Sequence, residues 1–517
     1  MKKWIYKTVI LATIAVFCSC DAMLDLTPED KVTGNNFWIE KGQVETAMVG
    51  GFGRLQECLY SFYAWGELRS DLVYVVGGSG GGHADRVNAN NNMITQENGL
   101  NDWGAVYSAI NQFNFVIHYA PQVQAADRSF SDEELAYFLG EARTMRALCY
   151  FYLARTFEQL PYITAASQTD EQRYDYEPIP ATAVLDSIVK DLLWAETRVR
   201  ENYNDVNFAT AALRLRYDKG RVTRPIVWAL LADVYLTQNN YDRSIEYSDK
   251  IINSGLYSLA SGPQQWYSIF YPGNSSEGIF ELQFAREYNN SGNFVRWFSN
   301  QSSVSGDNWY QIRMSMRTRT YLYWEGDDIY STRMVSDDRG RGGTYPYEMY
   351  SMPSMPVWKW IGIKHGSDDE DYRNASYNDP NWIFYRLADI YLMKAEALNR
   401  QGNMVDAARI VQNIRTRVAV QAEVSYSSQN ELENIILDER ASELAFEGKR
   451  WFDIVRIARR QNDYNVIADR LALAWTQSPL VEAVYRARVA DPQSWYFPIH
   501  RNELEKNPNL RQNIYYR

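Results

Sequence analysis

Cysteine and histidine are both scarce in this sequence, with four of each among 517 residues. The four cysteines are too few for the disulfide framework of a small secreted domain. Cys149 falls in an apolar helical pattern, where a buried thiol is the ordinary expectation. No two histidines have metal-ligand spacing and the H-E-x-x-H pattern is absent, so a zinc hydrolase is not expected.

The sequence also has no excess of positive charge and few long apolar stretches. Lys and Arg total 53 against 64 Asp and Glu, which gives a formal net charge of −11. A nucleic-acid partner requires a basic face, so this balance argues against that class. Beyond the first 20 residues no stretch is long and apolar enough to cross a membrane, and no Gly-Lys-Ser/Thr loop for phosphate is present.

The amino terminus has the features of a targeting segment. Three lysines precede an apolar run over residues 9–17, which is too short to span a bilayer. Residues 16–20 resemble the lipobox of bacterial lipoproteins, with Cys20 as the lipidated residue. We therefore expect a signal peptide over residues 1–19 and a lipidated, acidic tether over 20–36. The alternative is an ordinary secretory signal that happens to contain cysteines.

A hexapeptide that occurs twice organises the rest of the chain. Leu-Ala-Asp-Val-Tyr-Leu at 231–236 returns as Leu-Ala-Asp-Ile-Tyr-Leu at 387–392, each in a helical pattern followed by a second helix. After the second copy, Gly402 and Asn403 supply a stop and a turn, and apolar residues recur at helical spacing over 407–418. One such pair cannot bury its own apolar face, so several must stack. The pattern predicts a mainly α fold, a tetratricopeptide-like (TPR-like) scaffold of helix pairs.

The periodicity also indicates where this scaffold is interrupted. Residues 77–101 are rich in Gly and Asn and predict a long exposed loop, and the tail from residue 495 is predicted to be non-helical. Helices are predicted over 37–59, 103–119, 131–161, 180–200, 224–238, 241–252 and 383–460. The prediction is a single domain over 37–517, with helix-pair repeats at about 100–260 and 383–460 and a variable, irregular insertion over 261–382.

Several motifs resemble those of the SusD/RagB family of lipoproteins. The resemblance spans about residues 20–517, although His500 stands where many relatives continue differently. The motifs are Leu26-x-Pro28 after the lipidated Cys, residues 141–153, residues 437–453 (LDERASELAFEGKRWFD), Tyr496-Phe497-Pro498-Ile499, and residues 507–513 (NPNLRQN).

The resemblance implies TPR-like helix pairs that support a variable, loop-rich half. It also implies a protein anchored on the outer face of the Gram-negative outer membrane. Such proteins act as lids on a SusC-like TonB-dependent transporter, where they capture oligosaccharides or, in some relatives, peptides. They bind their ligands without catalysis, and no cofactor is implied.

Two loops formally match reactive or metal-binding motifs. Gly77-Gly78-Ser79-Gly80-Gly81 matches the G-x-S-x-G nucleophile elbow, which needs a strand before it and a helix after it. The residues that follow do not predict a helix start, so a flexible loop is favoured. Residues 368–371 (DDED) have oxygen ligands for calcium but lack the spacing of an EF-hand. A solvated acidic loop is favoured, which leaves a structural calcium ion as the one metal open.

The carboxylates Glu439, Glu443 and Glu447 allow two interpretations. On a helix they lie one turn apart, and a glycosidase requires two carboxylates about 5–10 Å apart. Arg440 or Arg450 could instead pair with them. We favour an ion-pair network that fixes the last helices.

Aromatic residues make up 14% of the chain, and seven of its 16 tryptophans lie between residues 266 and 382. Sugar rings have apolar faces and polar rims, which aromatic side chains flanked by amides and guanidinium groups suit. The alternative for each aromatic residue is packing between the two halves of the domain. The predicted ligand site comprises the stacking residues Trp297, Trp309 and Tyr310, the rim residues Asn308 and Arg313, and His83 and Asn91 from the 77–101 loop.

Three functions therefore compete. The first is a surface lipoprotein that binds oligosaccharides and delivers them to the transporter without catalysis. The second is the same scaffold capturing peptides, for which Arg and Asp pairs would matter more than stacking. The third is a cell-surface glycosidase that uses the acidic helix.

Overall fold

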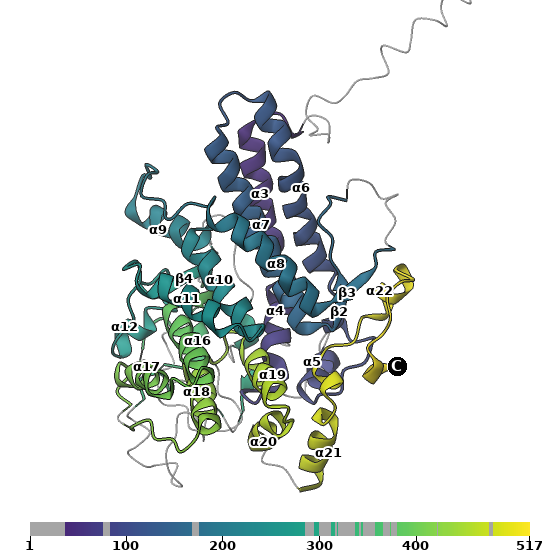
Figure 1. Cartoon of the computed structure of the whole chain (residues 1–517), viewed down its shortest axis with the longest axis vertical. Coiled ribbons are helices and arrows are strands. Elements are labelled where there is room, and N and C mark those ends of the chain that lie inside the picture. Colours follow the sequence, from purple (N-terminus) through teal and green to yellow (C-terminus); the bar gives the residue numbers. More distant parts are fainter. Residues whose placement is uncertain are drawn as a thin grey trace, which may run out of the picture.

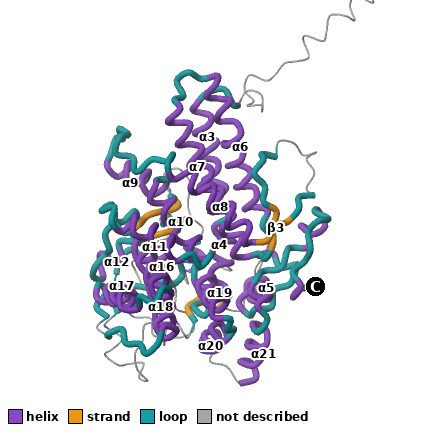
Figure 2. Tube along the Cα trace, in the orientation of Figure 1, coloured by secondary structure: helices purple, strands orange, loops and turns teal. Residues whose placement is uncertain are grey.

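The computed structural model describes residues 37–75, 83–167, 175–284, 380–420, 422–474 and 479–517, and between them the short segments 294–298, 312–315, 318, 337–340, 343–344, 357–365 and 373. Helices dominate these residues and the strands are few and short (Figure 2), so the mainly α prediction is confirmed. None of the helices in these segments is both long and apolar enough to cross a bilayer. The predicted signal peptide, Cys20 and the tether lie outside them.

Three long helices form the end of the molecule drawn at the top of Figure 1: α3 (Lys41–Glu57), α6 (Gly104–Ala126) and α7 (Asp132–Thr156). α6 packs against both α3 and α7. At the start of α7 the Ser131 hydroxyl accepts a hydrogen bond from the Glu134 N–H, and the Glu134 carboxylate accepts one from the Ser131 N–H at 3.1 Å. This is the capping box that the sequence predicts. α7 ends at Thr156, earlier than the predicted end at Pro161, and Gln159–Pro161 form a strand instead.

The two hexapeptide copies lie in the pairs α10 (Arg224–Thr237) with α11 (Tyr241–Ile252) and α16 (Leu387–Arg400) with α17 (Met404–Thr416). Asn240 and Asn403 cap the second helix of each pair in the same way, since each side chain accepts a hydrogen bond from the backbone N–H three residues ahead. α11 packs on α16, so the two pairs stack directly. α8 (Ala181–Glu196) and α18 (Gln429–Leu444) extend the stack on either side. The predicted helix-pair scaffold is confirmed.

Residues 382–386 form a strand where the sequence predicted the start of a helix. β6 (Trp382–Arg386) pairs antiparallel with β4 (Gly278–Leu282), and every residue of both strands is buried. A strand buried on both faces loses its alternation, so periodicity alone cannot separate it from a buried helix. Two other antiparallel pairs join β1 (Val73–Val75) to β5 (Ile312–Met314) and β2 (Gln159–Pro161) to β3 (Pro178–Pro180).

The predicted exposed loop over 77–101 is wrong for residues 83–90 and 99–101, whereas residues 91–98 are irregular as predicted and residues 77–82 lie outside the described part of the chain. Residues His83–Asn90 form helix α5, and Gly99–Asn101 form a 3-10 turn capped by the Asn98 side chain. Asn90 is buried, where its amide donates to the carbonyl oxygens of Leu68 and Val73 and its side-chain oxygen accepts from the Val75 N–H. Asn90, one of the asparagines that indicated a loop, therefore satisfies buried backbone groups instead.

Shorter elements complete the described chain. The helix α9 (Ala211–Gly220) was not predicted, and α22 (Arg501–Lys506) interrupts the tail that was predicted to be non-helical. The others are α4 (Leu59–Tyr63), a π-helix over Ala64–Leu68, α12 (Pro263–Tyr267), α13 (Val295–Phe298), α15 (Trp358–Ile361), α19 (Arg450–Gln461), α20 (Asn465–Ala474), α21 (Pro479–Val489), and 3-10 turns over Pro492–Trp495 and Ile514–Tyr516.

The described tryptophans of the variable segment pack it against the helices. Trp360 and Trp382 stack with ring centroids 5.2 Å apart, and Phe294 meets both rings edge-on. For these residues the packing alternative is the correct one. The tryptophans buried in this way are Trp266, Trp297, Trp358, Trp360 and Trp382.

Candidate ligand-binding site

The structure describes four of the seven residues of the predicted ligand site. Trp309, Tyr310 and Asn308 lie outside the described residues, so their role stays a prediction. The other four predicted residues, Trp297, Arg313, His83 and Asn91, are described and come from three different parts of the chain.

Arg313 lies at the centre of β5, directly opposite Tyr74 of β1. Their neighbours Val73, Val75, Ile312 and Met314 are buried, whereas Tyr74 and Arg313 are half-buried. Side chains alternate between the two faces of a strand, so Tyr74 and Arg313 project together from the face away from the core.

Asn91 joins the same face through Tyr485 of α21. The Tyr485 hydroxyl donates a hydrogen bond to Asn91 Oδ1 at 2.6 Å, and Arg488 Nη1 donates to the Asn91 carbonyl oxygen at 2.8 Å. Tyr485 also packs with Tyr74. Arg313 and Asn91 are thus brought together by two tyrosines that the sequence analysis missed. We call the set Tyr74, Arg313, Asn91, Tyr485 and Arg488 the β1–β5 face.

Burial raises the pKa of the Tyr485 hydroxyl, against the lowering effect of the Arg488 charge. The hydroxyl therefore stays protonated at neutral pH and donates to Asn91, which fixes the orientation of that amide. His83 is the first residue of α5, is half-buried, and lies on a helix that packs against β1. The predicted approach of this segment to the Arg313 region is consistent with that packing.

Trp297 occupies a different environment from the one predicted. Its side chain is only 6% exposed and packs against Tyr60, with ring centroids 4.9 Å apart, and against Tyr63, at 5.5 Å. A ring enclosed by other rings has no free face on which a sugar could stack. The stacking role therefore has no support at Trp297. Instead α13, which carries it, packs against β5 and supports the β1–β5 face from within.

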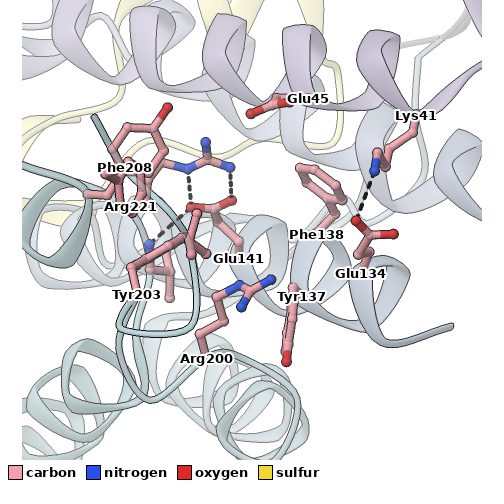
Figure 3. Close-up of a pocket in the computed structure, with 13 residues that line it drawn as sticks. Lys41, Glu45, Glu134, Tyr137, Phe138, Glu141, Arg200, Tyr203, Phe208 and Arg221 are labelled. Atoms are coloured by element: carbon pink, nitrogen blue, oxygen red, sulfur yellow. Dashed lines mark hydrogen bonds and ion pairs between the residues drawn. The ribbon is translucent and has the colours of Figure 1, made fainter. Parts of the chain in front are cut away.

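A second aromatic-lined site lies between α3, α7 and the segment that leads into α10 (Figure 3). This cavity has a volume of about 260 Å³. Arg221 forms a bidentate pair with Glu141, at 2.7 and 2.5 Å, and Lys41 pairs with Glu134 at 2.9 Å. We call it the α3–α7 cavity. Its aromatic lining residues are Tyr137, Phe138, Tyr203, Phe208 and Tyr217.

Several rings of the α3–α7 cavity are already in contact with other groups. The Arg200 guanidinium lies 4.1 Å from the centre of the Tyr137 ring, and Phe208 and Tyr217 pack with centroids 4.7 Å apart. The sequence analysis missed this site because it searched for tryptophan in the irregular segment. Tyr203 and Phe208, which fall between periodic helices, were the available signal.

The carboxylates of the acidic helix form the ion-pair network that we favoured. Glu443 is fully buried and contacts Arg386 at 2.5 Å and Arg339 at 3.1 Å, and it also pairs with Arg417. Burial alone would raise the pKa of Glu443, but the three arginines hold it well below its usual value. Glu447 lies beyond the end of α18 at Leu444, so the prediction that it shares the helix with Glu439 and Glu443 is wrong. It nevertheless pairs with Arg386, at 2.9 Å.

The predicted partners Arg440 and Arg450 are wrong for these glutamates. Arg440 pairs with Asp389 at 2.8 Å and with Asp453 at 2.9 Å, and Arg450 pairs with Asp71 at 2.7 Å. Asp71 precedes β1, whereas Arg450 begins α19, so this contact ties the two ends of the domain together. Such long-range pairing cannot be read from spacing on one helix.

The G-x-S-x-G motif and the predicted calcium loop both lie in segments that the structure does not describe in full. A strand, β1, precedes residues 77–81 and a helix, α5, follows them, so our argument that no helix follows this motif is wrong. Ser79 itself lies outside the described residues. Within the described part of the chain, no group of three or more His, Cys, Asp or Glu side chains is placed to hold a metal ion. Residues 368–371 lie outside that part, so calcium there stays a prediction.

Comparison with known proteins places these features in context. A family model described as the SusD family matches residues 235–516, and one described as "Starch-binding associating with outer membrane" matches residues 81–236. A SusD-like protein of Formosa agariphila, P38, is 25% identical over 98% of both chains. The starch-binding protein SusD of Bacteroides thetaiotaomicron is 27% identical over 40% of this chain and 34% of its own.

The fold has close counterparts among solved structures. A SusD superfamily protein from Bacteroides thetaiotaomicron superposes with a TM-score of 0.70 at 21% identity, covering 93% of this chain and 99% of the other. The surface glycan-binding protein A from Bacteroides uniformis superposes with a TM-score of 0.71 at 20% identity, covering 92% and 99%. At these identities the likeness concerns the fold.

Proposed function

This chain belongs to the SusD family, and from that membership we propose that it is a surface lipoprotein of the outer membrane that binds oligosaccharides without cleaving them. The observation that carries the proposal is the extent of the match. The two family models together cover residues 81–516, and the P38 relative aligns along nearly the whole chain. The names of the starch-binding and glycan-binding relatives supply the ligand class.

We place the ligand on the β1–β5 face, and we keep Trp309, Tyr310 and Asn308 as further predicted contacts. Tyr74 offers a half-buried aromatic ring, and Arg313, Arg488 and Asn91 offer hydrogen-bonding groups beside it, whereas Tyr485 is buried and supports Tyr74 and Asn91 from within. A sugar ring needs this combination, because its C–H faces are apolar and its hydroxyl rim is polar. The α3–α7 cavity is the competing location.

Delivery is the second part of the proposal. Cys20 carries the lipid that holds the protein on the outer face of the outer membrane. A SusC-like TonB-dependent transporter receives the bound oligosaccharide. The support is the lipobox-like sequence that ends at Cys20 and membership of the SusD family.

The test is a glycan array and a peptide library probed with the purified mature chain, followed by product analysis. The proposal predicts saturable binding to one class of oligosaccharide, with the bound glycan recovered intact. Binding to peptides alone would favour the peptide-capturing alternative. Shortened products from the bound glycan would instead establish the glycosidase.

A further inference from the structure

A second cavity, with a volume of about 160 Å³, lies between the end of α7, the turn from α10 to α11, and α19. All of its lining residues are described, and none of them is an Asp or a Glu. Four are arginines, in a chain whose formal net charge is −11. We call it the basic cavity. It is lined by Arg155, Thr237, Asn239, Phe452, Val455, Arg456, Arg459 and Arg460.

Carboxylates hold two of these guanidinium groups from the protein side. Arg456 pairs with Glu396 at 2.7 Å and with Asp453 at 2.8 Å, and Arg460 pairs with Glu396 at 2.9 Å and also with Glu433. All three carboxylates are buried, and none of them lines the cavity. The carboxylates thus fix the arginines in position from outside the cavity. The cavity lining itself presents guanidinium N–H donors and no carboxylate.

The other two arginines of the basic cavity are held less tightly, since Arg155 forms only a long ion pair with Asp233. Arg155 Nη1 lies 3.6 Å from Asp233, beyond hydrogen-bonding distance, and its guanidinium rests 4.1 Å from the centre of the Phe452 ring. Arg459 forms no ion pair with any carboxylate in the described part of the chain. Its guanidinium lies 4.1 Å from the centre of the Tyr496 ring.

Two lining residues also carry polar atoms whose hydrogen-bonding capacity is unused. Nε and Nη1 of Arg460 and Oγ1 of Thr237 are buried and have no hydrogen-bond partner among the described residues. The Arg460 side chain is only 5% exposed. Leaving buried donors unsatisfied is costly, especially on a charged group, and both residues line the basic cavity.

We propose that the basic cavity binds one oxyanion group, either a carboxylate, a sulfate or a phosphate. Guanidinium groups bind such anions through paired N–H donors, and the Thr237 hydroxyl can donate a further hydrogen bond. The cavity is built on the helix pairs rather than on the β1–β5 face, so this site does not depend on the proposed oligosaccharide function. The anion is either a free inorganic ion or the acidic group of a sugar.

The test uses titration calorimetry of the mature chain with sodium sulfate, sodium phosphate, sodium acetate and sodium glucuronate, each at matched ionic strength in sodium chloride. Saturable one-site binding of at least one of these probes is expected. If glucuronate binds at least tenfold more tightly than acetate, the source is an acidic sugar. If it does not, the source is a free anion.

Two variants locate the binding. Arg459→Gln alters an exposed side chain and should weaken binding about tenfold or more without changing the melting temperature. Thr237→Val keeps the shape of the side chain and should weaken binding several-fold. The control is Arg128→Gln, an exposed arginine before α7, which should leave binding unchanged. Absence of saturable binding for all four probes, or equal affinity in wild type and both variants, would overturn the proposal.

Discussion

At the scale of single residues, the aspartate of the repeated hexapeptide has two different roles. Asp389 is fully buried and pairs with Arg440 at 2.8 Å and with Lys449 at 2.5 Å. Its counterpart Asp233 accepts a hydrogen bond of 2.9 Å from the Tyr385 hydroxyl. Both connect a helix pair to a distant segment, so this position of the repeat forms cross-links while its neighbours provide apolar packing.

The ion pairs of Asp389 predict a specific dependence on pH. Burial by itself would raise the pKa of Asp389, yet Lys449 and Arg440 hold it at about 2, below its ordinary value of 3.8. A carboxylate with a lowered pKa stabilises the fold above its unfolded pKa and loses that contribution as the pH falls through the folded pKa. We expect Asp389→Asn to lower the free energy of unfolding by on the order of 3–5 kcal/mol at pH 7, because two buried cations lose a partner.

The difference between wild type and Asp389→Asn should shrink as the pH is lowered from about 4 to about 2. Urea unfolding at several pH values measures it. The matched control is Asp469→Asn, since Asp469 forms a surface pair with Arg486 and its side chain is 61% exposed. That change should cost less than about 1 kcal/mol at any pH. An Asp389→Asn effect that is independent of pH would contradict the account.

At the scale of elements, the two hexapeptides are equivalent in fold but not in burial. Tyr235 is 7% exposed and stacks on Tyr247 of α11, with centroids 5.8 Å apart and planes 14° apart. Tyr391 is only half-buried and packs at the junction of two apolar clusters. Equal sequence therefore predicts an equal backbone, whereas burial depends on which neighbours each pair receives.

This difference predicts unequal costs of truncation. Tyr235→Ala should lower the free energy of unfolding by about 3–5 kcal/mol, as for other buried aromatic residues. Tyr391→Ala should cost clearly less, because part of that ring is already in water. Chemical denaturation of the two variants measures both values. Equal costs, or a cost below about 0.5 kcal/mol at Tyr235, would show that the burial of the two pairs has been misjudged.

How far the elements could be predicted follows from where their contacts lie. The helix over Tyr241–Ile252 was predicted to the residue, because its apolar face repeats locally. The strand over Trp382–Arg386 and the helix over His83–Asn90 were missed. Both depend on partners far away in sequence: β4 for the strand, and Leu68 and Val73 for Asn90. Local sequence patterns cannot predict contacts with such distant partners.

The same reasoning applies to the candidate site. The sequence predicted Arg313 and Asn91 in one ligand site because both lie in segments that interrupt the repeats. The structure connects them through Tyr74 and Tyr485, and ligand binding there stays a prediction. The sequence analysis could not find Tyr485, which reaches Asn91 only through the tertiary fold. It also misjudged Trp297, since a tryptophan in an irregular segment has the same local pattern whether it packs or binds.

At the scale of the whole molecule, we propose that the amino terminus attaches the protein to the membrane. The described helices include none that could cross a bilayer. The lipobox-like residues 16–20 predict an anchor at Cys20. A multiply acylated terminus would hold the protein firmly, whereas a single chain binds membranes only marginally.

Cys20→Ala should therefore move the protein from the membrane fraction to the soluble fraction. Cell fractionation followed by immunoblotting measures the distribution. Cys58→Ala is the matched control, because it removes a buried thiol inside the domain and should leave the anchoring intact. Retention of Cys20→Ala at the wild-type level would place the anchor elsewhere.

The most direct test of the central claim, an oligosaccharide site on the variable half, is calorimetry with the best array ligand on matched aromatic variants. Trp309→Ala and Tyr310→Ala should each weaken binding about tenfold, or about 1.4 kcal/mol, with an unchanged melting temperature. Trp297→Ala should lower the melting temperature, because that ring is buried. Tyr203→Ala, in the α3–α7 cavity, should leave the affinity unaltered. Unchanged affinity in the first two variants together with lost affinity in Tyr203→Ala would contradict the claim and place the ligand in the α3–α7 cavity.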